Sequence, residues 1–557
     1  MNTFWHNNNY LTKTPIGFEH QGTNFRKAYE STVIAIDYNG FETYKCNSHV
    51  DHGSKKVVSR KQKPADQSAK MVAAYVEDEW SGAGEAISKS RSNCDGDEGY
   101  DFDNEIATKD VNLKAEETKK PKPNKETKPK VSLAEAAAKI DPWDLADSLA
   151  KISVSARLAP LYEPALLEMQ LLRFVDYLGI TLSAVQFPWL ETFKPWPKLI
   201  DLIDVPLSHI PEPVYKTSVD WLYQFPIGTL AVFVLLSLNY ILTNLEQGGP
   251  KGGDNGQQRT TSKSHVAIFV ALAMVLRIEP NTLVIVLPTL KEYKYRGHDK
   301  LPIIVWMVAQ ASQGDLSVGL HSWASNLLPL VLVDSNPHSM DLILQLVEKI
   351  LSTPNARTIL LNGVIIEELR LVSPYAFEIL MRRAFPSARV KATERFEAIY
   401  PLLKEVALAG EPGSESMKQV TQQIFYCSLV IAGKGNPALA TEATAMAIWS
   451  LTENVECCKQ WERLNWENQK GSAAVLKKLE DEWNDISLKL SSSPSHTFTL
   501  IQTMKNIRLK NKKATTEADK SSKVILGRLF RESGCLKGTA IITAVVLAAV
   551  VILSSNL

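Results

Sequence analysis

The residues that could do chemistry in this 557-residue chain are few and scattered. Its six cysteines include one adjacent pair, Cys457-Cys458, with no nearby His or further Cys to complete a metal site. Neither the His-Glu-x-x-His motif of metalloproteases nor the Gly-x-Ser-x-Gly motif of hydrolases occurs. His209 lies among prolines and His321 lies in an apolar segment, so both are interpreted as structural residues. The sequence therefore predicts that the chain is not an enzyme and has no metal ion or cofactor.

Charge and composition narrow the classes of partner. Lys and Arg number 62 and Asp and Glu 61, so the chain lacks the basic excess that is usual for nucleic-acid binding. The glycine-rich stretch 247–258 lacks the spacing of a phosphate-binding loop. No Asn-x-Ser/Thr glycosylation site occurs, and six cysteines are too few for a disulfide framework. We expect no nucleic acid and no small-molecule substrate, and a location mainly in a reducing compartment.

An apolar run at residues 536–553 predicts a C-terminal transmembrane helix, with a buried terminal helix as the alternative. Residues 538–553 carry no charge, and four residues follow, so a tail anchor inserted after synthesis is expected. Ten Lys or Arg and three acidic residues lie between Lys505 and Lys537, which predicts a cytosolic location for the bulk of the chain. The shortness of the run fits the thin endoplasmic-reticulum membrane. The predicted anchor residues are Leu536, Gly538, Ile541, Val545, Leu547, Val550 and Leu553.

Residues 491–535 are interpreted as a basic juxtamembrane linker. The lysines and arginines of this linker either only set the orientation of the anchor, or also bind anionic lipid headgroups. The cations nearest to the predicted membrane surface are Lys520, Lys523, Arg528, Arg531 and Lys537.

The rest of the chain divides into a disordered N-terminal region and an all-α domain. Residues 1–131 contain an acidic segment and a Lys/Pro-rich linker that cannot bury enough apolar surface to fold. From 132 to 490, a capping box at Ser132–Glu135 and repeated starts of the type Asp141-Pro142 alternate with apolar residues at helical spacing. The other starts are at Glu212-Pro213, Asn336-Pro337, Ser373-Pro374 and Asn436-Pro437. So many short helices predict an α-solenoid-like stack of helix pairs, of the HEAT or armadillo type, although no fixed repeat is found.

Two apolar patterns leave alternatives open. The stretch 227–245 is either a core helix or a second span; Asn239 and Asn244 favour the core helix. A heptad-like spacing at residues 476–490 indicates either a helix docked on the domain or a helix that dimerises or binds a protein partner. The residues of this seam are Leu476, Leu479, Trp483, Ile486 and Leu490.

Four long segments resemble the transmembrane protein 214 family, most closely its plant-type members. They are VPLSHIPEPVYKTSVDWL (205–222), TSKSHVAIFVALAMVLR (261–277), DKLPIIVWMVAQASQGDLSVGLHSW (299–323) and RVKATERFEAIYPLLKEVALAG (389–410). The resemblance implies an endoplasmic-reticulum membrane protein with a large helical cytosolic part that binds protein partners. It also implies a scaffold or adaptor role in apoptosis under endoplasmic-reticulum stress, through recruitment of a procaspase. The alternative function is a membrane-trafficking or membrane-organising factor without an apoptotic role.

Overall fold

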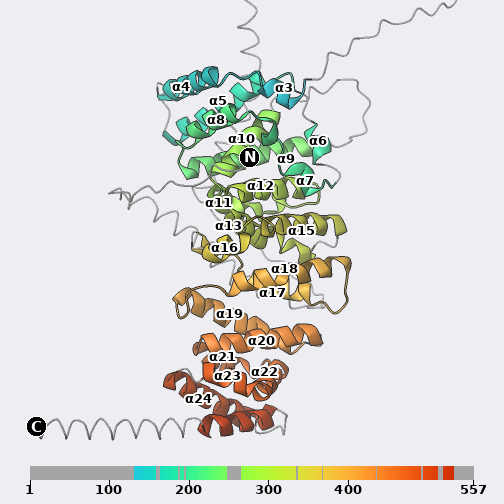
Figure 1. Cartoon of the computed structure of the whole chain (residues 1–557), viewed down its shortest axis with the longest axis vertical. Coiled ribbons are helices and arrows are strands. Elements are labelled where there is room, and N and C mark those ends of the chain that lie inside the picture. Colours follow the sequence, from blue (N-terminus) through green and yellow to red (C-terminus); the bar gives the residue numbers. More distant parts are fainter. Residues whose placement is uncertain are drawn as a thin grey trace, which may run out of the picture. The chain divides into compact units, whose positions relative to one another are not determined.

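A computed structural model describes most of the chain from residue 131 to residue 531 (Figure 1). The described ranges are 131–157, 163–185, 188–193, 196–247, 265–333, 336–366, 368–434, 436–490, 493–511 and 518–531. Of the region 1–131 that was expected to be disordered, the structure describes only Val131, which forms an isolated bridge with Val185. Residues 1–130, the expected anchor at 536–553 and Lys537 lie outside these ranges.

Helices account for 79% of the described residues, which confirms the all-α prediction in its general form. The two strands among the described residues, β1 (Ile365–Ile366) and β2 (Leu369–Arg370), form a short antiparallel hairpin. In the first half the helices are α3 (Leu133–Ala137), α4 (Pro142–Arg157), α5 (Glu163–Thr181), α6 (Trp189–Thr192), α7 (Leu199–Leu202), η1 (Leu207–His209), α8 (Glu212–Leu222), α9 (Ile227–Gln247), α10 (His265–Ile278), α11 (Asn281–Leu290), η2 (Tyr293–Tyr295), α12 (Leu301–Gly314) and α13 (Leu316–Ser322). In the second half they are η3 (Trp323–Leu327), α14 (Leu330–Val333), α15 (Pro337–Leu351), α16 (Ala356–Asn362), α17 (Pro374–Ala384), α18 (Lys391–Leu408), α19 (Glu415–Ala432), α20 (Pro437–Glu453), α21 (Glu456–Leu464), α22 (Gln469–Asp481), α23 (Trp483–Leu490), α24 (Pro494–Asn511) and an unlabelled helix over residues 518–531.

Most of the predicted helix starts are found as expected. The Ser132 hydroxyl accepts from the Glu135 N–H at 3.3 Å, and the Glu135 carboxylate accepts from the Ser132 N–H at 2.9 Å. Asp141, Asn336, Ser373 and Asn436 also cap the first turns of their helices. These bonds satisfy N–H groups that a helix start leaves unpaired.

The start at Glu212-Pro213 differs from the prediction. Glu212 is the first helical residue, and Pro211 stands at the cap position without a side-chain hydrogen bond. Proline has no polar side-chain atom, so this helix begins without the capping bond that an Asp or Asn would supply.

The helices pack mainly on others that are near in sequence, and neighbouring helices in Figure 1 therefore have similar colours. α4 contacts α5 and α8, α10 contacts α12, α17 contacts α18 and α19, and α19 contacts α20 and α22. The centre of α10 is enclosed on all sides, because residues 266–276 are each at most 2% exposed. The core therefore runs from one group of neighbouring helices to the next.

The folded part does not end at residue 490, so the predicted linker at 491–535 is wrong. α24 and the 518–531 helix belong to one apolar core with α19 to α23. Leu500, Met504 and Ile507 on α24 are buried there, as are Ile525 and Leu529 on the last helix. The prediction gave weight to the many lysines of this segment and overlooked that its apolar residues recur every three or four positions. This spacing is typical of a helix with one packed face.

Two described stretches are long and apolar enough to cross a membrane by length and composition, Ile227–Leu245 and Leu316–Val333. The pair α10 and α11 would also qualify as one broken span, with a bend of 114°. α9 nevertheless packs on α5, α10 and α11, with 44% of the Ile227–Leu245 stretch buried. These contacts favour the core-helix interpretation of 227–245.

Candidate functional site

The cysteines in the described residues are buried packing groups. Cys427, Cys457 and Cys458 are all free and buried. Burial raises the pKa of Cys427 and of Cys457 to about 12, and it also raises the pKa of Cys458. The Cys458 Sγ lies 4.0 Å from His496 Nε2, but no group of three metal-ligating side chains occurs among the described residues. At neutral pH these thiols therefore stay protonated and weakly nucleophilic.

The two histidines discussed above, His209 and His321, differ in exposure. His209 is exposed in η1. His321 is buried in α13, where Nδ1 lies 2.9 Å from the Arg370 carbonyl oxygen and Nε2 lies 3.4 Å from Ser325 Oγ. The position of His321 fits the structural interpretation, because its hydrogen bond joins α13 to β2.

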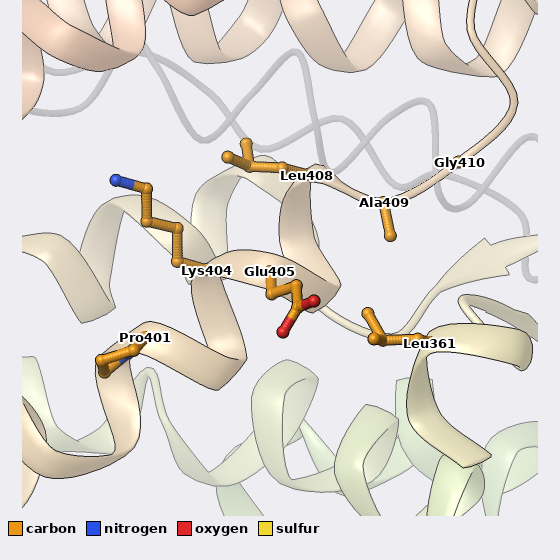
Figure 2. A pocket seen from close by; sticks show the side chains of 7 residues that line it. All are labelled: Leu361, Pro401, Lys404, Glu405, Leu408, Ala409 and Gly410. Carbon is orange, nitrogen blue, oxygen red and sulfur yellow. The ribbon is translucent and has the colours of Figure 1, made fainter. Parts of the chain in front are cut away.

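A surface pocket of about 700 Å³ lies where α16 meets α18 (Figure 2). Figure 2 shows the Glu405 carboxylate pointing into the space between the two helices, with Leu361 on the opposite side. Glu405 accepts a hydrogen bond from Arg357 Nε at 2.9 Å, which places an ion pair at the edge. The lining residues are Leu361, Pro401, Lys404, Glu405, Leu408, Ala409 and Gly410.

The end of α18, which forms one wall of this pocket, is held by Arg370. The guanidinium Nη2 donates to the carbonyl oxygens of Ala407, at 2.9 Å, and Ala409. Gly410 follows with a φ of 149°, a region that favours glycine, and a Cβ there would lie 2.6 Å from Met417 Sδ. The wall is therefore a fixed feature of the chain.

Lys404 is committed to a second polar group on the next helix pair. Its Nζ lies 2.6 Å from Glu442 Oε1, which also accepts from the Tyr400 hydroxyl at 2.9 Å. Burial, reinforced by Glu442, raises the pKa of Tyr400, so the phenol stays a donor. Because both charges of the pocket have partners, the space presents mainly apolar walls and suits an apolar side chain of a binding partner.

The five seam residues do not form an exposed surface. Leu476 and Leu479 lie on α22, and Trp483, Ile486 and Leu490 lie on α23, after a break at Glu482. All five are buried, at most 9% exposed, in the core shared with α19 to α24. Their burial favours the docked-helix interpretation over the partner-helix interpretation. The spacing was a signal of an interior face, which sequence alone does not separate from an exposed one.

The structure brings four of the five predicted cations onto the 518–531 helix but divides them. Lys520, Lys523 and Arg531 are exposed. Arg528 is half-buried, and its Nη1 donates to the Glu480 carbonyl oxygen, so it holds the last helix against α22. Sequence reasoning missed the aromatic neighbour of these cations, Phe530, which is 50% exposed.

The described part of the chain is a helical body in which two helices, or three if the bent pair α10 and α11 counts as one span, are long and apolar enough to cross a membrane. A protein-family model described as TMEM214, C-terminal, caspase 4 activator, matches residues 272–555, just over half of the chain. The chain therefore belongs to the TMEM214 family of transmembrane proteins. No curated protein and no solved structure matches it.

Proposed function

We propose that this chain is an adaptor of the endoplasmic-reticulum membrane, with a helical cytosolic body that recruits a caspase-type protease precursor under stress. The match to a family described as a caspase 4 activator carries this proposal. The matched segment begins in α10 and includes the α16–α18 pocket and the whole C-terminal core. On this proposal the chain binds the protease and does no chemistry itself.

The helical body serves this role as an α-solenoid-like stack. The support is the contact pattern, in which each group of helices packs on neighbours in sequence. A stack of this kind exposes a large surface for its length, which is how helical repeat proteins bind other proteins. The cations on the last helix belong to the same proposal, since they lie beside the expected anchor and can contact anionic headgroups.

In the membrane, we place the anchor at residues 536–553 and keep α9 within the cytosolic body. A glycosylation site appended after Leu557 should then be modified in microsomes, and one inserted into the 247–258 loop should not. Modification of the loop site would instead make Ile227–Leu245 a true span.

The α16–α18 pocket is the binding site that this proposal assigns to the protease precursor. The test is co-expression of the full chain with a caspase 4 precursor, followed by proximity labelling from the chain. Leu361→Asp places a charge in the apolar wall and should abolish labelling. Ile359→Asp is the matched control, since Ile359 lies on the same helix, is 40% exposed and does not line the pocket.

Three outcomes separate the parts of the proposal. Labelling that is lost only in Leu361→Asp supports the adaptor role and the pocket. Labelling of the precursor at the level of the parent chain in both variants would exclude the pocket as the binding site but keep the adaptor role. Absence of labelling in the parent chain contradicts protease recruitment and favours the membrane-organising alternative.

A further inference from the structure

The 518–531 helix has two sharply different faces. On one face, Ala518, Ile525, Leu526 and Leu529 pack into the C-terminal core, and Ser521 and Ser522 are buried beside them. The opposite side is one narrow stripe of exposed residues, because positions 520, 523, 524, 527 and 531 fall within about a third of the helix circumference. The helix is therefore amphipathic, with one buried face and one exposed face.

This outer stripe combines cations with apolar side chains. Lys520, Lys523 and Arg531 are exposed, between Val524, 37% exposed, and Phe530, 50% exposed. Lys505 of α24 adds a fourth cation, since its Nζ lies 5.2 Å from the centre of the Phe530 ring. We call these six residues the basic-aromatic stripe.

The one acidic residue within the described 518–531 helix does not neutralise the stripe. Asp519 lies on the flank of the helix, where its carboxylate is 3.2 Å from Arg508 Nε and is already paired. Arg528 lies on the other flank and is held by the Glu480 carbonyl oxygen. The stripe thus keeps a net positive charge around two exposed apolar side chains, which is the pattern of helices that lie in a membrane interface.

The stripe lies close in the chain to the apolar run at 536–553. Only residues 532–535 separate Arg531 from the apolar run at 536. Fully extended, this connection covers about 17 Å at most. If the run is the anchor proposed above, the end of the helix stays within a short reach of the headgroup layer.

We propose that the basic-aromatic stripe lies on the cytosolic leaflet, with Phe530 and Val524 at the headgroup boundary and the four cations against anionic lipid. This inference rests on the proposed anchor. It goes beyond it in assigning a second, separate membrane contact that is made by the folded body and that fixes how the body faces the bilayer. Arg528, although basic, has no part in this contact.

The experiment uses the full chain reconstituted into vesicles of phosphatidylcholine alone or mixed with phosphatidylserine. A photoreactive benzoylphenylalanine replaces Phe530 in one sample and Tyr375, on α17 and 58% exposed, in the control. Position 530 should form phospholipid adducts, more with phosphatidylserine and fewer at high salt, because screening weakens the attraction. Position 375 should form none.

A charge series completes the test. The triple variant Lys520→Gln, Lys523→Gln and Arg531→Gln should reduce the adduct at position 530, about five-fold for each cation removed. The control removes three exposed lysines elsewhere, Lys391, Lys434 and Lys470, and should leave the adduct unchanged.

The readouts distinguish failure of the stripe from failure of the anchor. Resistance of the chain to alkaline carbonate extraction reports the anchor alone. Adducts at position 530 that depend on phosphatidylserine and on the three cations support the stripe, whether or not carbonate releases the chain. Absence of adducts at 530, or equal adducts at 375, overturns the stripe even when the anchor is firmly inserted.

Discussion

Replacement of Gly471 by Ala should destabilise the C-terminal core, although alanine is the better helix former. Gly471 lies in the first turn of α22, where this helix crosses α19. A Cβ at this position would lie 1.9 Å from the Leu429 carbonyl oxygen and 3.3 Å from the Gly433 nitrogen. Leu429 is fully buried, so the obstructing atom belongs to a packed helix backbone and not to a movable side chain.

The size of the effect follows from two opposing terms. A carbon normally stays about 3.3 Å or more from a carbonyl oxygen, so α22 must withdraw by more than about 1 Å. Overpacking of this kind costs about 3 kcal/mol when the backbone must move. Alanine returns about 1 kcal/mol of helix propensity. We therefore expect a net loss of about 2 kcal/mol, or roughly a 30-fold rise in local opening.

Hydrogen–deuterium exchange with mass spectrometry measures this opening on peptides from α22. Gly527→Ala is the matched control, because a Cβ at Gly527 meets nothing within 4 Å on the exposed side of the 518–531 helix. Its helix should gain about 1 kcal/mol and exchange more slowly. If both variants slowed exchange alike, the close approach of α22 to α19 would be refuted.

Three further predictions concern buried side chains of the helical body. Trp483→Ala should destabilise the chain by about 3–5 kcal/mol in chemical unfolding, because Trp483 is only 4% exposed and its removal leaves a cavity; an unchanged unfolding midpoint would contradict its burial. Cys427, Cys457 and Cys458 should resist iodoacetamide in the native chain and react after denaturation, as read by peptide mass spectrometry, since burial raises the pKa of each thiol; native labelling would refute this. Burial lowers the pKa of His496, so below about pH 6.5 the unfolded chain binds the proton more readily than the folded chain, and stability should decrease as the pH is lowered. In thermal unfolding at a series of pH values, His496→Gln should lose this part of the pH dependence. An unchanged slope of stability against pH would count against the prediction.

Local signals in the sequence were enough to predict how most of these helices begin, with the start at Glu212 as the exception. Ser132, Asn336 and Ser373 cap their helices as expected, because a capping side chain needs only residues two or three positions away. The β1–β2 hairpin was not predicted, since each strand has only two residues and no alternating pattern. Signals that act over a few residues therefore survive without knowledge of the fold.

Features that depend on distant partners were not predictable in the same way. The heptad spacing that includes Leu476 is equally compatible with a free partner surface and with an interior face, and only the contacts of α22 with α19 and α20 separate the two. The α16–α18 pocket joins Leu361 to Glu405, residues that no local motif connects. The boundary at 490 failed because charge density was weighed above the spacing of Ile525 and Leu529.

Extension of the core to residue 531 changes what the segment before the apolar run can do. If residues 491–535 were a flexible linker, its two ends would lie about 35–40 Å apart on average. With residues 536–553 in the membrane, as proposed above, the four residues 532–535 would allow about 17 Å at most, and a partner bound to the body would be held near the bilayer in a narrow range of orientations.

Insertion of a long Gly/Ser segment between Ser533 and Gly534 tests whether this restraint matters. It leaves the core and the apolar run intact but restores a loose tether. We expect proximity labelling of the protease precursor to persist, because the binding surface is unchanged. The amount of lipid adduct at position 530 should decrease, because the stripe is no longer held at the membrane. An insertion of the same length in the 247–258 loop is the control. If the adduct were equally strong with the long tether, the stripe would bind lipid by its own affinity, and the short connection would not be what positions the body.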